Sequence, residues 1–109
     1  MPEPRIINLD SNEETKHLKI LSGPPESVTM RSGMVVLPPE SSVGLHSTEN
    51  YEELIIILEG QATISVKGRT PVKVESGNAF YCPPDTEHDV FNSGTEPLRY
   101  IYIVAEVRK

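Results

Sequence analysis

The sequence predicts one all-β domain, an antiparallel jelly-roll barrel or sandwich, and three observations support this. Short apolar segments recur along the chain at intervals of roughly 8 to 12 residues, with turn residues between them, as in sandwiches and barrels. Ten prolines and seven glycines among 109 residues disfavour a helical bundle. A chain of this length suits a single hydrophobic core.

Residues 1–27 are predicted to form an N-terminal arm, and residues 28–109 the barrel. Within the arm, Ile6, Ile7 and Leu9 are expected in a short strand, and Asp10 or Ser11 would cap a helical turn that runs to Lys16. Residues 23–25, Gly-Pro-Pro, end the arm because consecutive prolines remove amide donors and fix φ.

The barrel segment is predicted to consist of strands separated by proline and glycine turns. Leu54–Leu58, the turn Glu59-Gly60 and the alternating Ala62–Val66 have the pattern of a hairpin. Lys67-Gly68 predicts a second turn. The expected strands cover residues 28–30 and 34–37 on either side of Ser32-Gly33, then 54–58, 62–66, 72–74, 79–82, 90–91 and 98–107.

The last predicted strand is apolar on both faces. One face carries Leu98, Tyr100, Tyr102 and Val104, and the other carries Ile101, Ile103 and Ala105. A small barrel buries only one face of each strand, so the second apolar face predicts a homodimer, with the arm contributing to the contact.

Composition argues against two classes of partner. The net charge is −6, and the lysines and arginines are scattered, whereas nucleic-acid binding requires a basic patch. No segment approaches the roughly 18 apolar residues of a membrane span, and the N-terminus lacks the pattern of a signal peptide. The single cysteine, Cys82, fits a reducing compartment and is expected to be a small buried side chain. We expect a cytoplasmic protein that binds neither nucleic acid nor membrane.

Two of the three histidines lie at strand edges among acidic residues. His46 is followed by Thr48 on the same side of an extended segment, and His88 precedes another predicted strand. His17 lies among lysines in the arm and is expected to be a solvated surface side chain. Alternation places Glu52 and Glu53 on opposite faces of the next strand, and does not show which of them faces inward.

Two motifs now resemble those of the cupin superfamily of small β-barrels. His46-Ser-Thr48, four residues, Glu53, six residues and Gly60 resemble the first cupin motif, His-x-His, three or four residues, Glu, six residues, Gly. Gly77, five residues, Pro83, then Asp85, His88 and Asn92 resemble the second, Gly-x5-Pro-x-Gly-x2-His-x3-Asn.

The resemblance implies a jelly-roll barrel with one divalent metal in its mouth. Matched position by position, the implied ligands are His46, Glu53 and His88, and Glu53 is favoured over Glu52. Thr48 stands where the family has a second histidine, so it is a neighbour of the site in place of a fourth ligand, since a hydroxyl is a poorer ligand than imidazole. Either it hydrogen-bonds a metal-bound water or it fills the space of the lost ligand.

Two more positions differ from the motifs. Asp85 and Glu40 replace glycines. Aspartate adopts positive φ more readily than most residues, so the turn at Asp85 can survive, whereas the replacement at Glu40 is sterically harder to accommodate. Asn92 is expected to bond a turn near the site, and Tyr81, Tyr100 and Tyr102 to belong to the core or the pocket wall.

Two imidazoles and one carboxylate suit Fe(II), and could also hold Mn, Ni, Co or Zn. Such a set leaves coordination positions open for a small polar substrate, which allows a dioxygenase, an isomerase or a lyase. One alternative is a non-catalytic module that binds or senses a small ligand, and another is a metal-free barrel that serves as a scaffold. On the loop before the strand, Glu49, Tyr51 and Glu52 are candidate proton donors or acceptors.

Overall fold

The computed structural model describes residues 2–9 and 16–107, and this part of the chain contains nine strands and no helix. Strand bounds agree closely with the expected segments from residue 54 onward. The strands are β1 (His17–Ser22), β2 (Arg31–Leu37), β3 (His46–Ser47), β4 (Tyr51–Glu59), β5 (Gln61–Val66), β6 (Val72–Glu75), β7 (Ala79–Cys82), β8 (Glu87–Asn92) and β9 (Leu98–Glu106).

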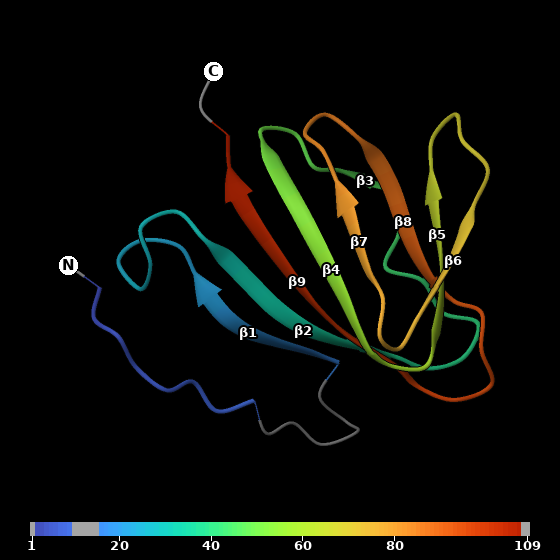
Figure 1. The fold of residues 1–109 in the computed structure, drawn as a ribbon, viewed down its shortest axis with the longest axis horizontal. Coiled ribbons are helices and arrows are strands. Elements are labelled where there is room, and N and C mark those ends of the chain that lie inside the picture. Colours follow the sequence, from blue (N-terminus) through green and yellow to red (C-terminus); the bar gives the residue numbers. More distant parts are fainter. Residues whose placement is uncertain (1, 10–15, 108–109) are drawn as a thin grey trace.

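The strands form two antiparallel sheets, which confirms the predicted jelly-roll class. One sheet has five strands in the order β1-β2-β9-β4-β7, and the other has four in the order β3-β8-β5-β6 (Figure 1). The long β4 and β9 pair over most of their length at the middle of the larger sheet. Strands distant in sequence are thus neighbours in space, as the crossing connections of a jelly roll require.

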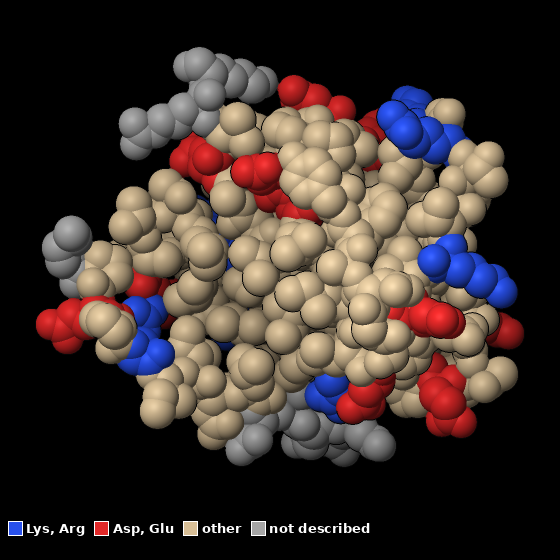
Figure 2. All heavy atoms as spheres, in the orientation of Figure 1, with Lys and Arg blue, Asp and Glu red and all other residues tan. Residues whose placement is uncertain are grey.

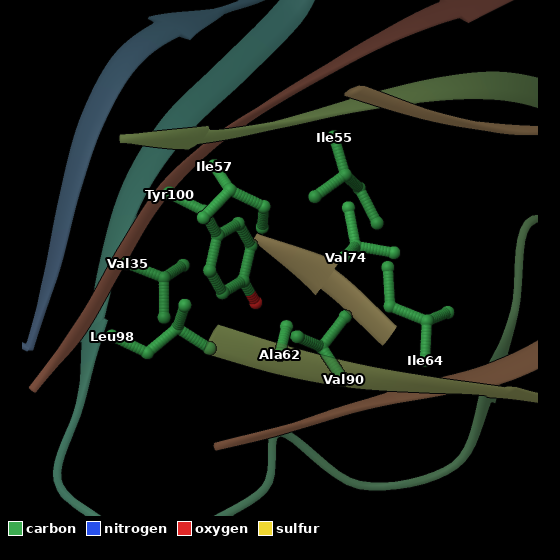
Figure 3. Close-up of a cluster of buried hydrophobic side chains, with 9 residues drawn as sticks. All are labelled: Val35, Ile55, Ile57, Ala62, Ile64, Val74, Val90, Leu98 and Tyr100. Carbon is green, nitrogen blue, oxygen red and sulfur yellow. The ribbon is translucent and has the colours of Figure 1, made fainter. Parts of the chain in front are cut away.

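The core lies between the sheets and follows the alternation of the strands. Leu98 and Tyr100 of β9 point inward with Ile55 and Ile57 of β4, and Ile64 of β5 faces them from the other sheet (Figure 3). Ile55, Ile64 and Leu98 are at most 1% exposed. The sequence left open which of the two apolar faces of the last strand is inward, and the structure shows that it is the face with Leu98 and Tyr100.

The predicted hairpin between Leu54–Leu58 and Ala62–Val66 is wrong, because β4 and β5 belong to different sheets. Gly60 forms the corner between the sheets with φ of 89°. A Cβ at this position would lie 2.8 Å from the carbonyl oxygen of Pro97. Only glycine allows the chain to turn this close to the neighbouring backbone.

The second half of the arm is part of the larger sheet, since β1 pairs with β2. Residues 2–9 form no strand, which corrects the expectation for Ile6, Ile7 and Leu9. The predicted helical turn, at residues 10–16, lies largely outside the described residues. Ser32-Gly33 does not interrupt a strand as expected: β2 runs through it, and Val28–Met30 precedes the strand.

Charged side chains are distributed around the surface. In Figure 2 the centre of the visible face is uncharged, and the lysines and arginines on it lie apart from one another near the edges. Among the described residues, no helix is long and apolar enough to span a bilayer.

Candidate metal centre

His46, Glu53 and His88 come together where the two sheets face each other. The short β3 pairs with β8 so that His46 lies directly opposite His88 in the smaller sheet. Glu53 approaches from β4 in the larger sheet and is 8% exposed. Its neighbour Glu52 points to the other face, where it accepts a hydrogen bond from the Tyr81 hydroxyl at 2.9 Å. Glu53, and not Glu52, is therefore the carboxylate that points toward the two histidines.

The candidate ligand atoms of these three residues all lie within 4.8 Å of one another. His88 Nε2 lies 2.7 Å from Glu53 Oε1, and the His46 and His88 rings have centroids 4.3 Å apart. His88 is 1% exposed, whereas His46 is exposed at the rim. The group is thus buried on one side and open to solvent on the other.

Both histidines are oriented by the backbone in the same way. His46 Nδ1 lies 2.8 Å from the carbonyl oxygen of Gly44, and His88 Nδ1 lies 3.2 Å from that of Thr86. A carbonyl only accepts, so each Nδ1 carries the proton and each Nε2 is left to face the centre. Such a second hydrogen bond commonly fixes the tautomer of a metal-binding histidine.

The contact with Glu53 shifts the pKa of His88 upward. Burial alone lowers the pKa of this imidazole, because it disfavours the charged form. Hydrogen bonds to Glu53 and to the Thr86 carbonyl, together with the negative charges of Glu53 and Asp89, outweigh burial and raise the pKa above its usual value. With Nδ1–H committed to Thr86, the additional proton lies between His88 Nε2 and Glu53.

The donor set fits a divalent transition metal. Imidazole nitrogens and carboxylate oxygens lie about 2.0–2.2 Å from Zn²⁺, so two ligand atoms of one ion are at most about 4.4 Å apart. The three atoms already lie within 4.8 Å of one another, and side-chain movements would bring them to the shorter separations that one ion requires. Two nitrogens and one oxygen leave further coordination positions open, as in sites that bind a substrate or water.

Thr48 is buried beside this group, and two backbone groups use its hydroxyl. The Thr48 hydroxyl donates to the carbonyl of Pro83 at 2.7 Å and accepts from the amide of Thr86 at 3.1 Å. It therefore ties the loop before β4 to the loop before β8. Its proton is committed to Pro83, and its oxygen retains one lone pair.

The same two loops contain residues in the left-handed region. Asp85 has φ of 52° and donates its amide to the carbonyl of Glu49, which has φ of 53°. Asp85 thus adopts positive φ at the glycine position of the second motif, as expected. Glu40, at the glycine position of the first motif, has φ of 67°.

A cavity of about 450 Å³ extends from the three residues into the space between the sheets. Its walls are mostly apolar, but three polar residues also line it: His17, Tyr100 and Tyr102. His17 Nε2 lies 2.6 Å from the Tyr102 hydroxyl. His17 is exposed as expected, yet its place at the cavity was missed, because its partner lies 85 residues away in sequence.

A second, smaller hollow of about 330 Å³ adjoins the three residues, and a positively charged side chain lines it. Arg31, the first residue of β2, lines this hollow with His46, Thr48 and Glu53. One of its nitrogens, Nη1, donates to the carbonyl of Ser22 at 2.8 Å. Local sequence did not predict Arg31 at this hollow, since only the pairing of β2 with β9 places it there.

Cys82 and Asn92, which the sequence analysis also discussed, contribute to packing and to a turn. Cys82 is fully buried, and burial together with the charge of Glu53 raises its pKa to about 11. Asn92 donates to the carbonyls of Leu37 and Glu96, both at 2.9 Å, and accepts from the amide of Gly94. Asn92 bonds a turn as expected, but this turn follows the end of β8 and is not near the candidate metal centre, which lies at the start of that strand.

The chain matches the cupin domain family over residues 33–104. It is 30% identical over 88 residues to an uncharacterised protein from Methanocaldococcus jannaschii, covering 81% of this chain and 66% of the relative. It is 31% identical over 68 residues to an oxalate-binding protein from Thermotoga maritima, covering 62% of this chain and 55% of that relative. The chain thus spans between half and two thirds of these relatives.

Solved structures with the same architecture cover nearly the whole chain. An RmlC-like cupin family protein with a double-stranded β-helix fold, from M. jannaschii, has a TM-score of 0.81 at 19% identity, with 94% of this chain and 91% of that one covered. A predicted oxalate decarboxylase from T. maritima has a TM-score of 0.77 at 26% identity, with 84% and 79% covered.

Proposed function

The chain belongs to the cupin family, and we propose that it holds a divalent transition metal through His46, Glu53 and His88 and binds a small carboxylate beside that metal. The metal would be Fe, Mn, Ni, Co or Zn, since this ligand set suits each of them. When bound, the metal would supply a positive charge and open positions that polarise a ligand oxygen.

One observation carries the proposal: the candidate ligand atoms of His46, Glu53 and His88 lie within 4.8 Å of one another. Within this group, His88 Nε2 and Glu53 Oε1 are only 2.7 Å apart. Two lone pairs pointing at each other in a buried site repel, so a positive charge must lie between them. In the metal-free protein a proton has this role, which is why the pKa of His88 is raised. A metal ion would replace the proton and gain His46 Nε2 as a third partner.

The carboxylate character of the ligand is supported by Arg31. A guanidinium has five N–H donors in a planar fork that matches a carboxylate. Within residues 2–9 and 16–107 its side chain donates only to the Ser22 carbonyl, and Arg31 lines the same hollow as His46 and Glu53. The relative described as an oxalate-binding protein and the structure described as a predicted oxalate decarboxylase make oxalate the first acid to test.

Oxalate titration by calorimetry tests the proposal. We expect oxalate to bind the Mn²⁺-loaded protein and to give no binding heat with metal-stripped protein. Arg31→Gln should weaken binding about tenfold or more, because hydrogen bonds to charged groups contribute about 1.5–3 kcal/mol. Arg69→Gln, which removes an exposed arginine outside this hollow, is the matched control. Equal oxalate affinity with and without metal would contradict the proposal.

Catalysis is a further step within the same proposal. The open positions would permit a dioxygenase, an isomerase or a lyase acting on the bound acid. Oxygen uptake by Fe(II)-loaded protein would distinguish an oxygenase, and conversion of oxalate to one formate and one carbon dioxide without oxygen uptake would identify a lyase. Binding without turnover would leave the ligand-binding or sensing module.

A metal-free scaffold is the competing function, and one observation favours it. His88 and Glu53 already satisfy each other, so the buried polar groups need no metal to be paired. In a scaffold of this kind, the protein would take up none of the five metals at neutral pH.

We also propose a homodimer formed through the outer face of the larger sheet. On that face Leu54 and Leu58 of β4 are each 38% exposed, and Ile101 and Ile103 of β9 are only half-buried. A contiguous apolar surface of this kind is commonly covered by a second copy. A monomeric mass by light scattering at micromolar concentration would contradict the dimer.

A further inference from the structure

The Tyr100 side chain is mostly buried, and its hydroxyl, which is not among the fully buried polar atoms without a partner, is open to the cavity. Tyr100 is 3% exposed, lies in the hydrophobic core and lines the large cavity (Figure 3). Within residues 2–9 and 16–107 no hydrogen bond is made by its hydroxyl. Buried hydroxyls normally have a partner in the protein, in water or in a ligand. The phenol therefore presents an unused donor to the cavity.

Tyr102 presents a second hydroxyl to the same cavity, held by His17. The Tyr102 oxygen lies 2.6 Å from His17 Nε2, and the two rings are 5.6 Å apart between centroids. Gly33 on β2 leaves room for this pair: a Cβ there would lie 2.6 Å from the Tyr102 oxygen and 2.8 Å from His17 Nε2. A glycine in a strand interior often marks such a close approach.

The backbone positions of Tyr102 and Tyr100 lie farther along β9 than the row that holds Glu53. Val104 pairs with Glu53 across β9 and β4, and Tyr102 and Tyr100 follow at two and four residues along β9 on the same face. With a rise of about 3.4 Å per residue, their backbone positions lie about 7 Å and about 14 Å from the row of Glu53. Val35, Ile55 and Val90 provide apolar wall around them.

We propose that Tyr100 and Tyr102 form a second polar end of the binding cavity and hydrogen-bond the far oxygen of an elongated acid whose near carboxylate lies at the metal. The ligand class is thus a dicarboxylate or oxo acid longer than oxalate. The inference rests on the proposed metal-dependent binding of a carboxylate.

The size of the cavity supports a ligand longer than oxalate. A volume of about 450 Å³ equals that of roughly fifteen waters at about 30 Å³ each. Oxalate has two carbons and would fill only a small part of this volume. Burial, and then the charge of Glu53, raise the pKa of both Tyr100 and Tyr102, so both phenols keep their protons at neutral pH.

Calorimetric titration of Mn²⁺-loaded protein with oxalate, succinate and glutarate tests the proposal. We expect succinate or glutarate to bind more tightly than oxalate. Tyr100→Phe should weaken binding of the longer acid about three- to tenfold, the loss typical of one hydrogen bond, and leave oxalate and Mn²⁺ affinities unchanged. Tyr81→Phe removes an exposed hydroxyl on the opposite face and is the matched control.

A second variant, at Gly33, tests the role of the Tyr102 hydroxyl without a substitution at Tyr102 itself. Gly33→Ala displaces the His17–Tyr102 pair, and should also weaken the longer acid while leaving the Mn²⁺ affinity unchanged. If the parent binds oxalate at least as tightly as succinate and glutarate, or if Tyr100→Phe behaves as Tyr81→Phe does, the second polar end does not exist.

The Mn²⁺ titration is measured first and separates the two proposals. If Mn²⁺ binds and oxalate binding depends on it, the proposed function stands whatever the longer acids do. If Mn²⁺ does not bind, the proposed function fails, and the inference that rests on it fails with it.

Discussion

At the scale of single residues, one proton and one metal ion compete for the same place. His88 Nε2 and Glu53 Oε1 lie 2.7 Å apart, and His88 is almost fully buried. A buried pair of this kind is stable only while a positive charge lies between its members. Protonation of His88 therefore stabilises the metal-free protein, and metal binding must release that proton.

This competition gives the metal-free protein a defined pH dependence. The pKa of His88 is raised on folding from about 6.5, so its contribution to stability is fully present below pH 6.5. That contribution is lost as the pH rises through the raised value. The urea midpoint of metal-stripped protein should fall as the pH increases from 6.5 towards 8, and His88→Ala should reduce this fall.

Addition of Mn²⁺ provides the internal control, because bound metal replaces the proton. The midpoint of saturated protein should not decrease over the same pH range. A metal-free midpoint that rises steadily with pH would show that His88 is not protonated against Glu53.

The resemblance to the cupin motifs was the most useful signal for the site. It indicated His46, Glu53 and His88, which lie on three strands, and the structure brings these three together. Tyr102 was expected in the core or the pocket wall, but His17 and Arg31 were not expected at the cavity, because their proximity depends on pairing between strands that are distant in sequence. Such pairings are not visible in local spacing.

At the scale of elements, three loop residues store backbone strain. Glu40, Glu49 and Asp85 all have positive φ between 52° and 67°, a region that costs most residues about 1–2 kcal/mol. Asp85 and Glu40 stand at positions where the cupin motifs have glycine. Asp85 and Glu49 lie in the loops beside the candidate metal centre, whereas Glu40 lies outside it and donates its amide to the carbonyl of Asn92 at 3.1 Å.

Glu40→Gly tests this strain directly. Glycine removes the left-handed penalty but makes the unfolded chain more flexible, which costs about 0.4–1 kcal/mol. We expect a net gain in unfolding free energy of about 0.5–1 kcal/mol by urea denaturation. Glu59→Gly lies at the end of β4, a strand position without positive φ, and should destabilise.

The alternation of apolar and polar residues predicted which side chains share one face of a strand. It did not predict that the chain passes from one sheet to the other at Gly60. The dipeptide Glu59-Gly60 reads as a hairpin turn in sequence. In the structure the chain crosses there from one sheet to the other, because Gly60 passes close to the Pro97 carbonyl. Hairpins and sheet-to-sheet corners use the same turn residues, so local sequence does not separate them.

At the scale of the whole molecule, the proposed ligands join the two sheets. His46 and His88 belong to the four-stranded sheet and Glu53 to the five-stranded sheet (Figure 1). A metal held by all three would connect the two layers at the open end of the core. Its binding should therefore stabilise the fold as a unit.

Thermal unfolding measures this connection. A ligand at 100 times its Kd stabilises the native state by about 2.7 kcal/mol, which corresponds to a Tm increase of about 10 °C for a domain of this size. We expect such an increase on addition of Mn²⁺ or Zn²⁺ to the stripped parent. The same metals should leave the Tm of His88→Ala almost unchanged.

The most direct measurement is the metal content of untagged protein by mass spectrometry, beside His88→Ala and Glu53→Gln. We expect close to one transition metal ion per chain in the parent, and almost no bound metal in either variant. A parent that contains no metal and takes up none of Fe, Mn, Ni, Co or Zn would contradict the account, and would favour the metal-free scaffold.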